Sequence, residues 1–150
     1  RVEDTLARLG LSATLLHADA TQRDWWNGTP FDAILLDAPC SGSGVIRRHP
    51  DIKRLRRPSD IPKLVELQSR LLDNLWPLLR PGGSMVYATC SVLREENDEQ
   101  IEAFLSRTAD AIATTPQEVS WGRPAGAGRQ LLPETESHDG FFYARLKRQG

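Results

Sequence analysis

The sequence predicts a doubly wound α/β domain, in which strands of a largely parallel sheet alternate with helices. Two apolar runs, 33–36 and 84–88, have the length and composition of buried strands. Between them lies a leucine-rich stretch with helical spacing. The chain has 150 residues, which is enough for one domain with a hydrophobic core.

The elements before the long helix are short. Residues 1–9 predict a helix, because their apolar residues share one face and Gly10 follows them. Residues 13–16 predict a strand, and residues 24–26 a helical turn. Residues 32–36 predict the next strand, and a long loop follows it.

The long helix is predicted to begin after Pro58, where Ser59 or Asp60 can cap it. Leucines form its apolar stripe, and Pro77 is expected to kink it. We expect the glycine-rich segment 81–83 to end this helix and the strand 84–88 to follow.

The last third of the chain is less regular. Residues 95–105 predict a helix with acidic residues in its first turn, which suits the helix dipole. Residues 118–121 predict a short strand, and residues 124–128 a flexible loop. Residues 140–146 alternate between large apolar and other side chains, which predicts a final strand near a sheet edge.

Composition sets few limits on function. The formal net charge is -1, from 19 basic and 20 acidic residues, and a protein with this balance can still carry a basic patch for nucleic acid. No apolar stretch is long enough to span a bilayer, and no signal-peptide pattern opens the chain. Two cysteines do not make a disulfide framework. These features favour a soluble, cytoplasmic protein with reduced thiols.

The two cysteines each follow a predicted strand. Cys40 comes after the run 33–36, and Cys90 comes after the run 84–88. Because ligands of an open parallel sheet bind beyond the carboxyl ends of its strands, we expect both thiols to face one crevice. Such a pair suits methylation of cytosine at C5, a carbon too weakly nucleophilic to react unaided. A thiolate can add to C6 and activate C5, and a second group can then assist elimination. A helix beginning soon after Cys90 could favour its thiolate.

Several motifs together resemble the RNA cytosine-C5 methyltransferases, most closely the Sun/Fmu type that acts on bacterial 16S ribosomal RNA. The resemblance covers nearly the whole chain. It is carried by the motifs Asp37-Ala38-Pro39-Cys40-Ser41, Gly44-Val45-Ile46-Arg47-Arg48-His49-Pro50-Asp51-Ile52-Lys53, Pro81-Gly82-Gly83, Tyr87-Ala88-Thr89-Cys90-Ser91-Val92-Leu93, Glu95-Glu96-Asn97, Gln130-Leu131-Leu132-Pro133 and Asp139-Gly140-Phe141-Phe142-Tyr143-Ala144.

This resemblance implies a Rossmann-like class I methyltransferase fold with S-adenosylmethionine as cofactor. It implies that Cys90 is the nucleophile that adds to C6 and that Cys40 assists breakdown of the covalent adduct. Asp37 would lie by the methyl donor and the target base, Pro39 would shape the turn, and Asp19 would contact the adenine end of the cofactor. It further implies a monomeric full-length enzyme that acts on 16S ribosomal RNA without a metal.

A basic run follows the Cys40 loop. Arg47, Arg48, His49, Lys53 and Arg54 are candidate RNA contacts, because basic side chains neutralise backbone phosphates. A solvated face is the alternative interpretation of such a run.

The resemblance also predicts that residues 1–150 form only part of a catalytic domain. The expected strand order is 3-2-1-4-5-7-6, and strands 1 and 2, with the RNA-binding helical domain, would be missing. The chain alone is therefore expected to bind cofactor weakly and to show little catalysis. Two alternatives stay open: a non-catalytic RNA-binding remnant of this fold, and an α/β oxidoreductase with a redox cysteine pair. The usual Cys-x-x-Cys spacing of the latter is absent.

Overall fold

A computed structural model describes residues 2–134 and 138–150, so Arg1 lies outside the described residues. Its centre is a six-stranded mixed sheet in the order β1-β2-β6-β5-β4, with β3 also paired to β6. The strands are β1 (Phe31–Asp37), β2 (Leu79–Thr89), β3 (Ala111–Ala113), β4 (Arg123–Ala125), β5 (Gly128–Leu131) and β6 (Phe141–Arg148).

The α-helices are α1 (Val2–Leu9), α2 (Ile52–Leu55), α3 (Asp60–Leu75) and α4 (Asp98–Arg107). Three short 3-10 helices are η1 (Ser43–Val45), η2 (Trp76–Leu78) and η3 (Arg94–Glu96). No helix in the described ranges is long and apolar enough to cross a membrane.

Parallel pairing of β1 with β2 sets the position of both cysteines. The two strands are connected through α3, and their register pairs Leu36 with Tyr87 and Asp37 with Ala88. Both strands therefore end at the same edge of the sheet. The turns that carry Cys40 and Cys90 leave the sheet side by side at this edge.

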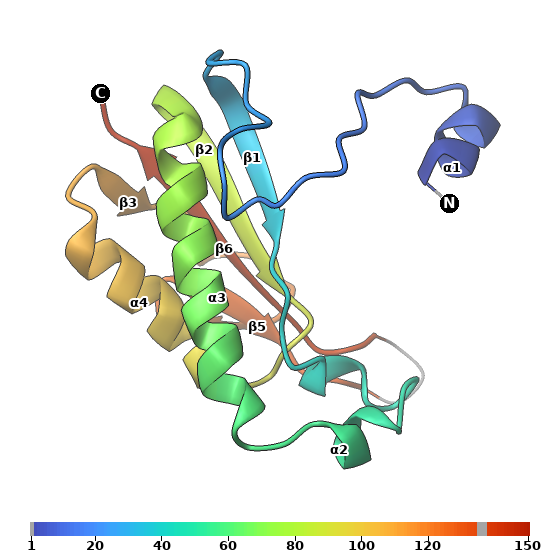
Figure 1. The fold of residues 1–150 in the computed structure, drawn as a ribbon. Helices are drawn as coiled ribbons and strands as arrows, with labels where there is room; N and C mark the ends of the chain where they lie inside the picture. The colour runs from blue at the N-terminus through green and yellow to red at the C-terminus, as the bar shows by residue number, and fades with distance from the viewer. Residues whose placement is uncertain (1, 135–137) are drawn as a thin grey trace.

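The hydrophobic core lies between the sheet and the helices α3 and α4, which cover one face together (Figure 1). Alternation in β2 turns Met85 and Tyr87 toward this core, and both are fully buried. Phe142 in β6 meets Tyr87 in an edge-to-face contact with ring centroids 6.4 Å apart. The predicted α/β class is thus confirmed.

The second face of the sheet has no helix over it in the described residues, in contrast to a doubly wound sheet. The opposite alternation leaves Leu35 72% exposed, and Val86 and Tyr143 only half-buried. The predicted N-terminal helix forms as α1, but it lies away from the sheet and buries none of its residues (Figure 1).

Residues 13–16 form no strand, so that prediction was wrong. A strand needs a neighbour to bind its backbone groups. Among the described strands β1 pairs only with β2, and segment 11–19 is exposed.

The long helix ends earlier than its leucine stripe suggested. It stops at Leu75, and Pro77 lies in the 3-10 turn η2 rather than in a kinked helix. Strand β2 already begins at Leu79, so segment 81–83 lies inside the strand and not at a helix end. The register with β1 is irregular there, which accommodates the proline and the glycines. The helix expected at 95–105 divides into η3 and α4.

Three expectations for the C-terminal third were also wrong. Residues 118–121 form no strand, because the buried Arg129 guanidinium binds the carbonyl groups of Val119, Trp121 and Gly122. The expected flexible loop 124–128 instead belongs to the β4–β5 hairpin. Strand β6 is internal, with β2 on one side and β3 and β5 on the other.

Gly44 joins three segments next to the cysteines. Its N–H donates to the Cys90 carbonyl at 2.9 Å, and its carbonyl accepts from the Gly140 N–H at 2.8 Å. A Cβ at position 44 would lie 2.1 Å from the Gly140 carbonyl oxygen and 2.9 Å from that of Cys90. The close approach of three backbones therefore requires glycine.

We expect Gly44→Ala to lower the free energy of unfolding by about 1–3 kcal/mol, because backbone must move to admit the methyl group. The change is measured by denaturant unfolding of the full-length protein. Gly150→Ala is the control, since a Cβ there meets nothing within 4 Å. Equal stability of Gly44→Ala and the unsubstituted protein would contradict this packing.

Candidate active site

The two thiols lie at the carboxyl edge of the sheet. The Cys40 Sγ and Cys90 Sγ atoms are 3.4 Å apart, within hydrogen-bonding range for sulfur, and both residues are half-buried free cysteines. The structure therefore brings the pair together, as expected from the strand ends.

The two sulfurs differ in proton affinity. The hydrogen bond from Cys40 favours the Cys90 thiolate and lowers the pKa of Cys90 to about 7, against burial and the carboxylates of Asp37 and Glu96, which raise it. The same hydrogen bond, together with burial, raises the pKa of Cys40 far above its ordinary value. At neutral pH a large fraction of Cys90, roughly half, is therefore thiolate, while Cys40 keeps its proton. The Cys40 hydrogen bond replaces the helix dipole expected from the sequence, since α4 begins only at Asp98.

A buried carboxylate lies between the two cysteine turns. Glu96 accepts hydrogen bonds from the Ser41 N–H, the Ser41 hydroxyl and the Ser91 hydroxyl. The side-chain amide of Gln68 donates to Glu96 and to the Pro39 carbonyl. These contacts tie the turn after β1 to the turn after β2.

Asn97 is a second polar residue that holds the Cys90 turn. The Asn97 amide donates to the Ser91 carbonyl at 3.0 Å, and its oxygen accepts from the Thr89 hydroxyl at 2.6 Å. Gln130 also donates to the Ser91 carbonyl, at 3.1 Å. The backbone after Cys90 is therefore held by Asn97, which lies between η3 and α4, and by Gln130 of β5.

Asp37 and Pro39 lie on the same edge as the thiols. Asp37 ends β1 with its side chain exposed, and its carboxylate contributes to the pKa shifts of both Cys90 and Tyr143. Burial, and then this carboxylate, raises the pKa of Tyr143. Pro39 is exposed and lies directly before Cys40.

Asp19 lies in the segment between α1 and β1. It is exposed, and hydrogen bonds from the Thr21 N–H and hydroxyl, both 2.8 Å, lower its pKa. The neighbouring residues Ala18 and Ala20, with Trp25, line a hollow of about 740 Å³. No contact in the described structure joins Asp19 to the cysteine turns.

The basic run is exposed and partly paired. Arg47 and Arg48 both reach the buried carboxylate of Asp139, Arg47 at 3.6 Å. His49, Lys53 and Arg54 are exposed beside them.

The next arginine in the sequence, Arg56, makes hydrogen bonds to the protein's own backbone. Arg56 donates to the carbonyls of Cys40 and Ser41 at 3.4 and 3.2 Å, so it braces the Cys40 turn.

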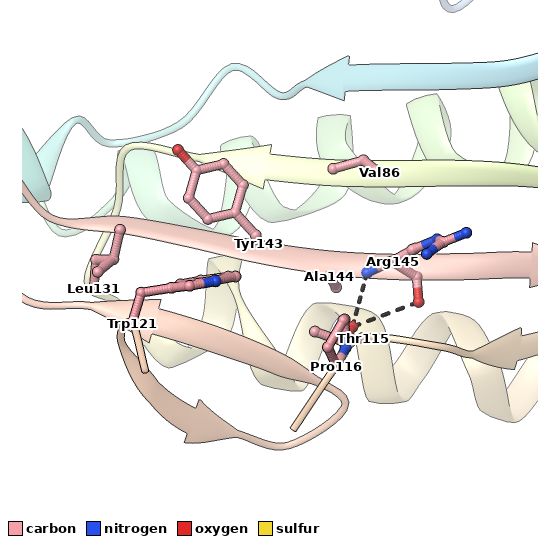
Figure 2. Close-up of a pocket in the computed structure, with 8 residues that line it drawn as sticks. All are labelled: Val86, Thr115, Pro116, Trp121, Leu131, Tyr143, Ala144 and Arg145. Carbon is pink, nitrogen blue, oxygen red and sulfur yellow. Dashed lines mark hydrogen bonds between the residues drawn. The ribbon is translucent and has the colours of Figure 1, made fainter. Parts of the chain in front are cut away.

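A second hollow, of about 380 Å³, lies on the open face of the sheet (Figure 2). Figure 2 shows Trp121 close to Tyr143, with the helices behind the strands. The two ring centroids are 6.0 Å apart. Thr115 closes one end through hydrogen bonds to the backbone of Arg145. Neither cysteine lines this hollow.

Sequence reasoning missed the polar residues that hold the cysteine turns. The sequence predicts Glu96 in the first turn of a helix and Gln68 within the long helix. Neither position predicts a role at the cysteine site. The sequence feature that could have indicated these residues is the polar pair Glu96-Asn97, which follows Cys90 by a few positions. No group of three or more His, Cys, Asp or Glu residues that could hold a metal ion occurs in the described part of the chain.

Comparison with known proteins agrees with this geometry. The sequence model described as "16S rRNA methyltransferase RsmB/F" matches residues 1–147. Ribosomal RNA small subunit methyltransferase B from Xylella fastidiosa (strain Temecula1) is 58% identical over 147 residues, which cover 97% of this chain and 34% of the relative. The chain thus spans about a third of the length of such relatives.

Solved structures share the fold. A methyltransferase homologue from Pyrococcus horikoshii has a TM-score of 0.80 at 33% identity, over 97% of this chain and 48% of that one. NSun6 from the same organism, solved with SFG, has a TM-score of 0.84 at 28% identity, over 99% of this chain and 38% of that one. From the match over almost its whole length, we conclude that this chain belongs to the 16S rRNA methyltransferase RsmB/F family.

Proposed function

We propose that this chain carries the catalytic cysteines of an enzyme that methylates C5 of a cytosine in 16S ribosomal RNA. The observation that carries the proposal is the pair of thiols 3.4 Å apart, of which Cys90 has a pKa lowered to about 7. Membership of the RsmB/F family supports ribosomal RNA as the substrate. An RNA-modifying enzyme with free cysteines suits the cytoplasm.

In this proposal Cys90 is the nucleophile. Its thiolate forms a bond to C6 of the target ring, and the electrons of the C5–C6 double bond make C5 nucleophilic. C5 then takes the methyl group. Elimination removes the proton from C5, restores the double bond and breaks the S–C6 bond. The Cys90 sulfur leaves as a thiolate.

Cys40 serves the elimination. Its pKa is raised first by the hydrogen bond it makes to the Cys90 sulfur. That cause weakens once Cys90 is bonded to carbon and no longer carries charge. Cys40 can then lose its proton to solvent water more readily, and the resulting thiolate accepts the C5 proton directly or through a water. The resemblance to the RNA cytosine-C5 methyltransferases favours Cys90 over Cys40 as the nucleophile, and the lowered pKa of Cys90 agrees with this assignment.

S-adenosylmethionine is the proposed methyl donor, and it supplies an electrophilic methyl group when bound. A relative's structure contains SFG, an analogue of this cofactor. The residues present fit part of such a molecule. Asp37 offers an exposed carboxylate beside the thiols, with Pro39 shaping the turn. Asp19 adjoins the hollow at Trp25, whose aromatic and apolar lining suits an adenine ring.

The exposed basic residues Arg47, Arg48, His49, Lys53 and Arg54 are proposed to contact RNA phosphates. They follow the Cys40 turn directly, so a bound strand would lie next to the reactive pair. The same surface would serve the alternative function, a non-catalytic RNA-binding remnant. The low pKa of Cys90 favours the enzyme, because RNA binding alone does not need a thiolate.

We expect Cys90→Ser in the full-length protein to reduce methyl transfer to 16S ribosomal RNA by at least about 10³-fold, because the adduct cannot form. Cys40→Ser should instead accumulate a covalent protein–RNA adduct, because elimination slows after addition. Methyl transfer is measured with labelled cofactor and the adduct by denaturing electrophoresis. Each variant controls for the other. An adduct formed by Cys90→Ser would refute the assignment, and an inactive unsubstituted protein would favour the RNA-binding remnant.

The rate of methyl transfer should rise with pH around the Cys90 pKa of about 7. The thiolate is the reactive form, so kcat/KM, which reports the free enzyme, should increase roughly tenfold between about pH 6 and pH 8. Cys40→Ala removes the hydrogen-bond donor, so the pH rise in its rate of adduct formation, a step that precedes elimination, should move to higher pH. A rate that is flat over this range would argue against thiolate addition as the limiting step.

Lys53→Ala and Arg54→Ala should each weaken RNA binding and reduce the slope of log K against log salt by about 0.7 per lost phosphate contact. The measurement is a salt titration of RNA affinity. Lys147→Ala is the matched control, since this exposed cation lies on β6 opposite Ser84, away from the cysteine edge. Equal slopes for all three variants would place the RNA elsewhere.

A further inference from the structure

Glu96 is a carboxylate with no exposed surface. It ends η3, and none of the ion pairs within residues 2–134 and 138–150 involves it. Burying an unpaired charge is costly, and such a group is kept only where hydrogen bonds satisfy it. Four donors do so here.

The four donors come from both cysteine turns. Oε1 accepts from the Ser41 N–H at 2.8 Å and from the Gln68 amide at 3.1 Å. Oε2 accepts from the Ser41 hydroxyl at 2.6 Å and from the Ser91 hydroxyl at 2.5 Å. Ser41 directly follows Cys40, and Ser91 directly follows Cys90. One side chain thus bridges the two residues next to the reactive sulfurs.

We propose that Glu96 is a positioning residue, whose carboxylate joins the two cysteine turns and so holds the thiols at hydrogen-bonding distance. The importance of this role rests on the proposed function of the cysteines. Glu96 bonds to neither sulfur, and its effect passes through Ser41 and Ser91.

Glu96 has two opposite effects on the pKa of Cys90, one through the position it gives the turns and one through its charge. The Cys40 thiol and a backbone hydrogen bond at Cys90 favour the Cys90 thiolate, whereas burial and the carboxylates of Asp37 and Glu96 oppose it. Arg56 is a cation that binds the Cys40 turn through its backbone carbonyls. If Glu96 acted by charge alone, removing its charge would make Cys90 more acidic. If it positions the turns, withdrawing its carboxylate should make Cys90 less acidic.

Two substitutions separate these effects. Glu96→Asp keeps the charge but withdraws the carboxylate by about 1.5 Å, one carbon–carbon bond, so it cannot reach both turns. Glu96→Gln keeps the length and an acceptor oxygen but loses the charge. The readout is the rate of Cys90 alkylation by iodoacetamide as a function of pH, with Cys40 and Cys90 distinguished by peptide mass mapping.

We expect Glu96→Asp to raise the pH midpoint of Cys90 alkylation by about one unit, since the Cys40 hydrogen bond is strained or lost. Glu96→Gln should leave the midpoint unchanged or lower it. A midpoint for Glu96→Asp that is unchanged or lowered would overturn the proposal. If Glu96→Asp does not fold, Ser91→Ala provides the test, because it removes the donor on the Cys90 side. It should raise the midpoint by a smaller amount, and an unchanged midpoint would overturn the proposal.

Two controls exclude a general loss of structure. Glu95→Asp alters the exposed neighbour of Glu96, and Ile101→Val weakens the core in α4. Both should leave the alkylation midpoint unchanged, although Ile101→Val lowers stability by about 0.5–1.5 kcal/mol. If Ile101→Val raised the midpoint as much as Glu96→Asp, the effect of Glu96 would be one of general stability, and the positioning role would be overturned. The assay uses no RNA, so failure of the unsubstituted protein to methylate RNA would reject the proposed function without deciding this inference.

Discussion

Parallel pairing of β1 with β2 is the constraint on which the site depends. Parallel strands end at one edge of a sheet, so two turns that are 50 positions apart in the chain begin side by side. The connection through α3 makes this pairing possible and also supplies Gln68 to the site. The two sulfurs are thus placed by the sheet, and the loops make only the final adjustment.

That final adjustment is polar. Thr89, Ser91, Glu96, Asn97 and Gln130 are buried, and hydrogen bonds join them into a network beneath the Cys90 turn. Losing a hydrogen-bond partner destabilises the fold more when the polar group is buried than when it is exposed. Such a network therefore tolerates few alternative arrangements. It therefore favours a single geometry for the thiols, whereas apolar packing, which is not directional, would permit small shifts of the two turns.

The cysteine pair and the basic run stand on different kinds of structure. The cysteine turns rest on a rigid sheet, whereas His49, Lys53 and Arg54 are exposed on a loop and the short helix α2. Covalent addition requires atoms held to a fraction of an ångström, whereas phosphate contact acts over several ångströms and tolerates movement. This division matches a site that would hold a base firmly and a strand more loosely.

The sequence by itself determined the apolar strands β1 and β2, the helix between them, the cysteines at their ends and the family. Each of these is recorded in local periodicity or in contiguous motifs. Only the tertiary structure decided the rest. Segment 13–16 formed no strand because it has no neighbour in the described sheet, and Arg129 drew the backbone of 119–122 away from strand pairing. Glu96 gained its place between the thiol turns from contacts with Ser41, 55 positions away, which no local pattern reveals.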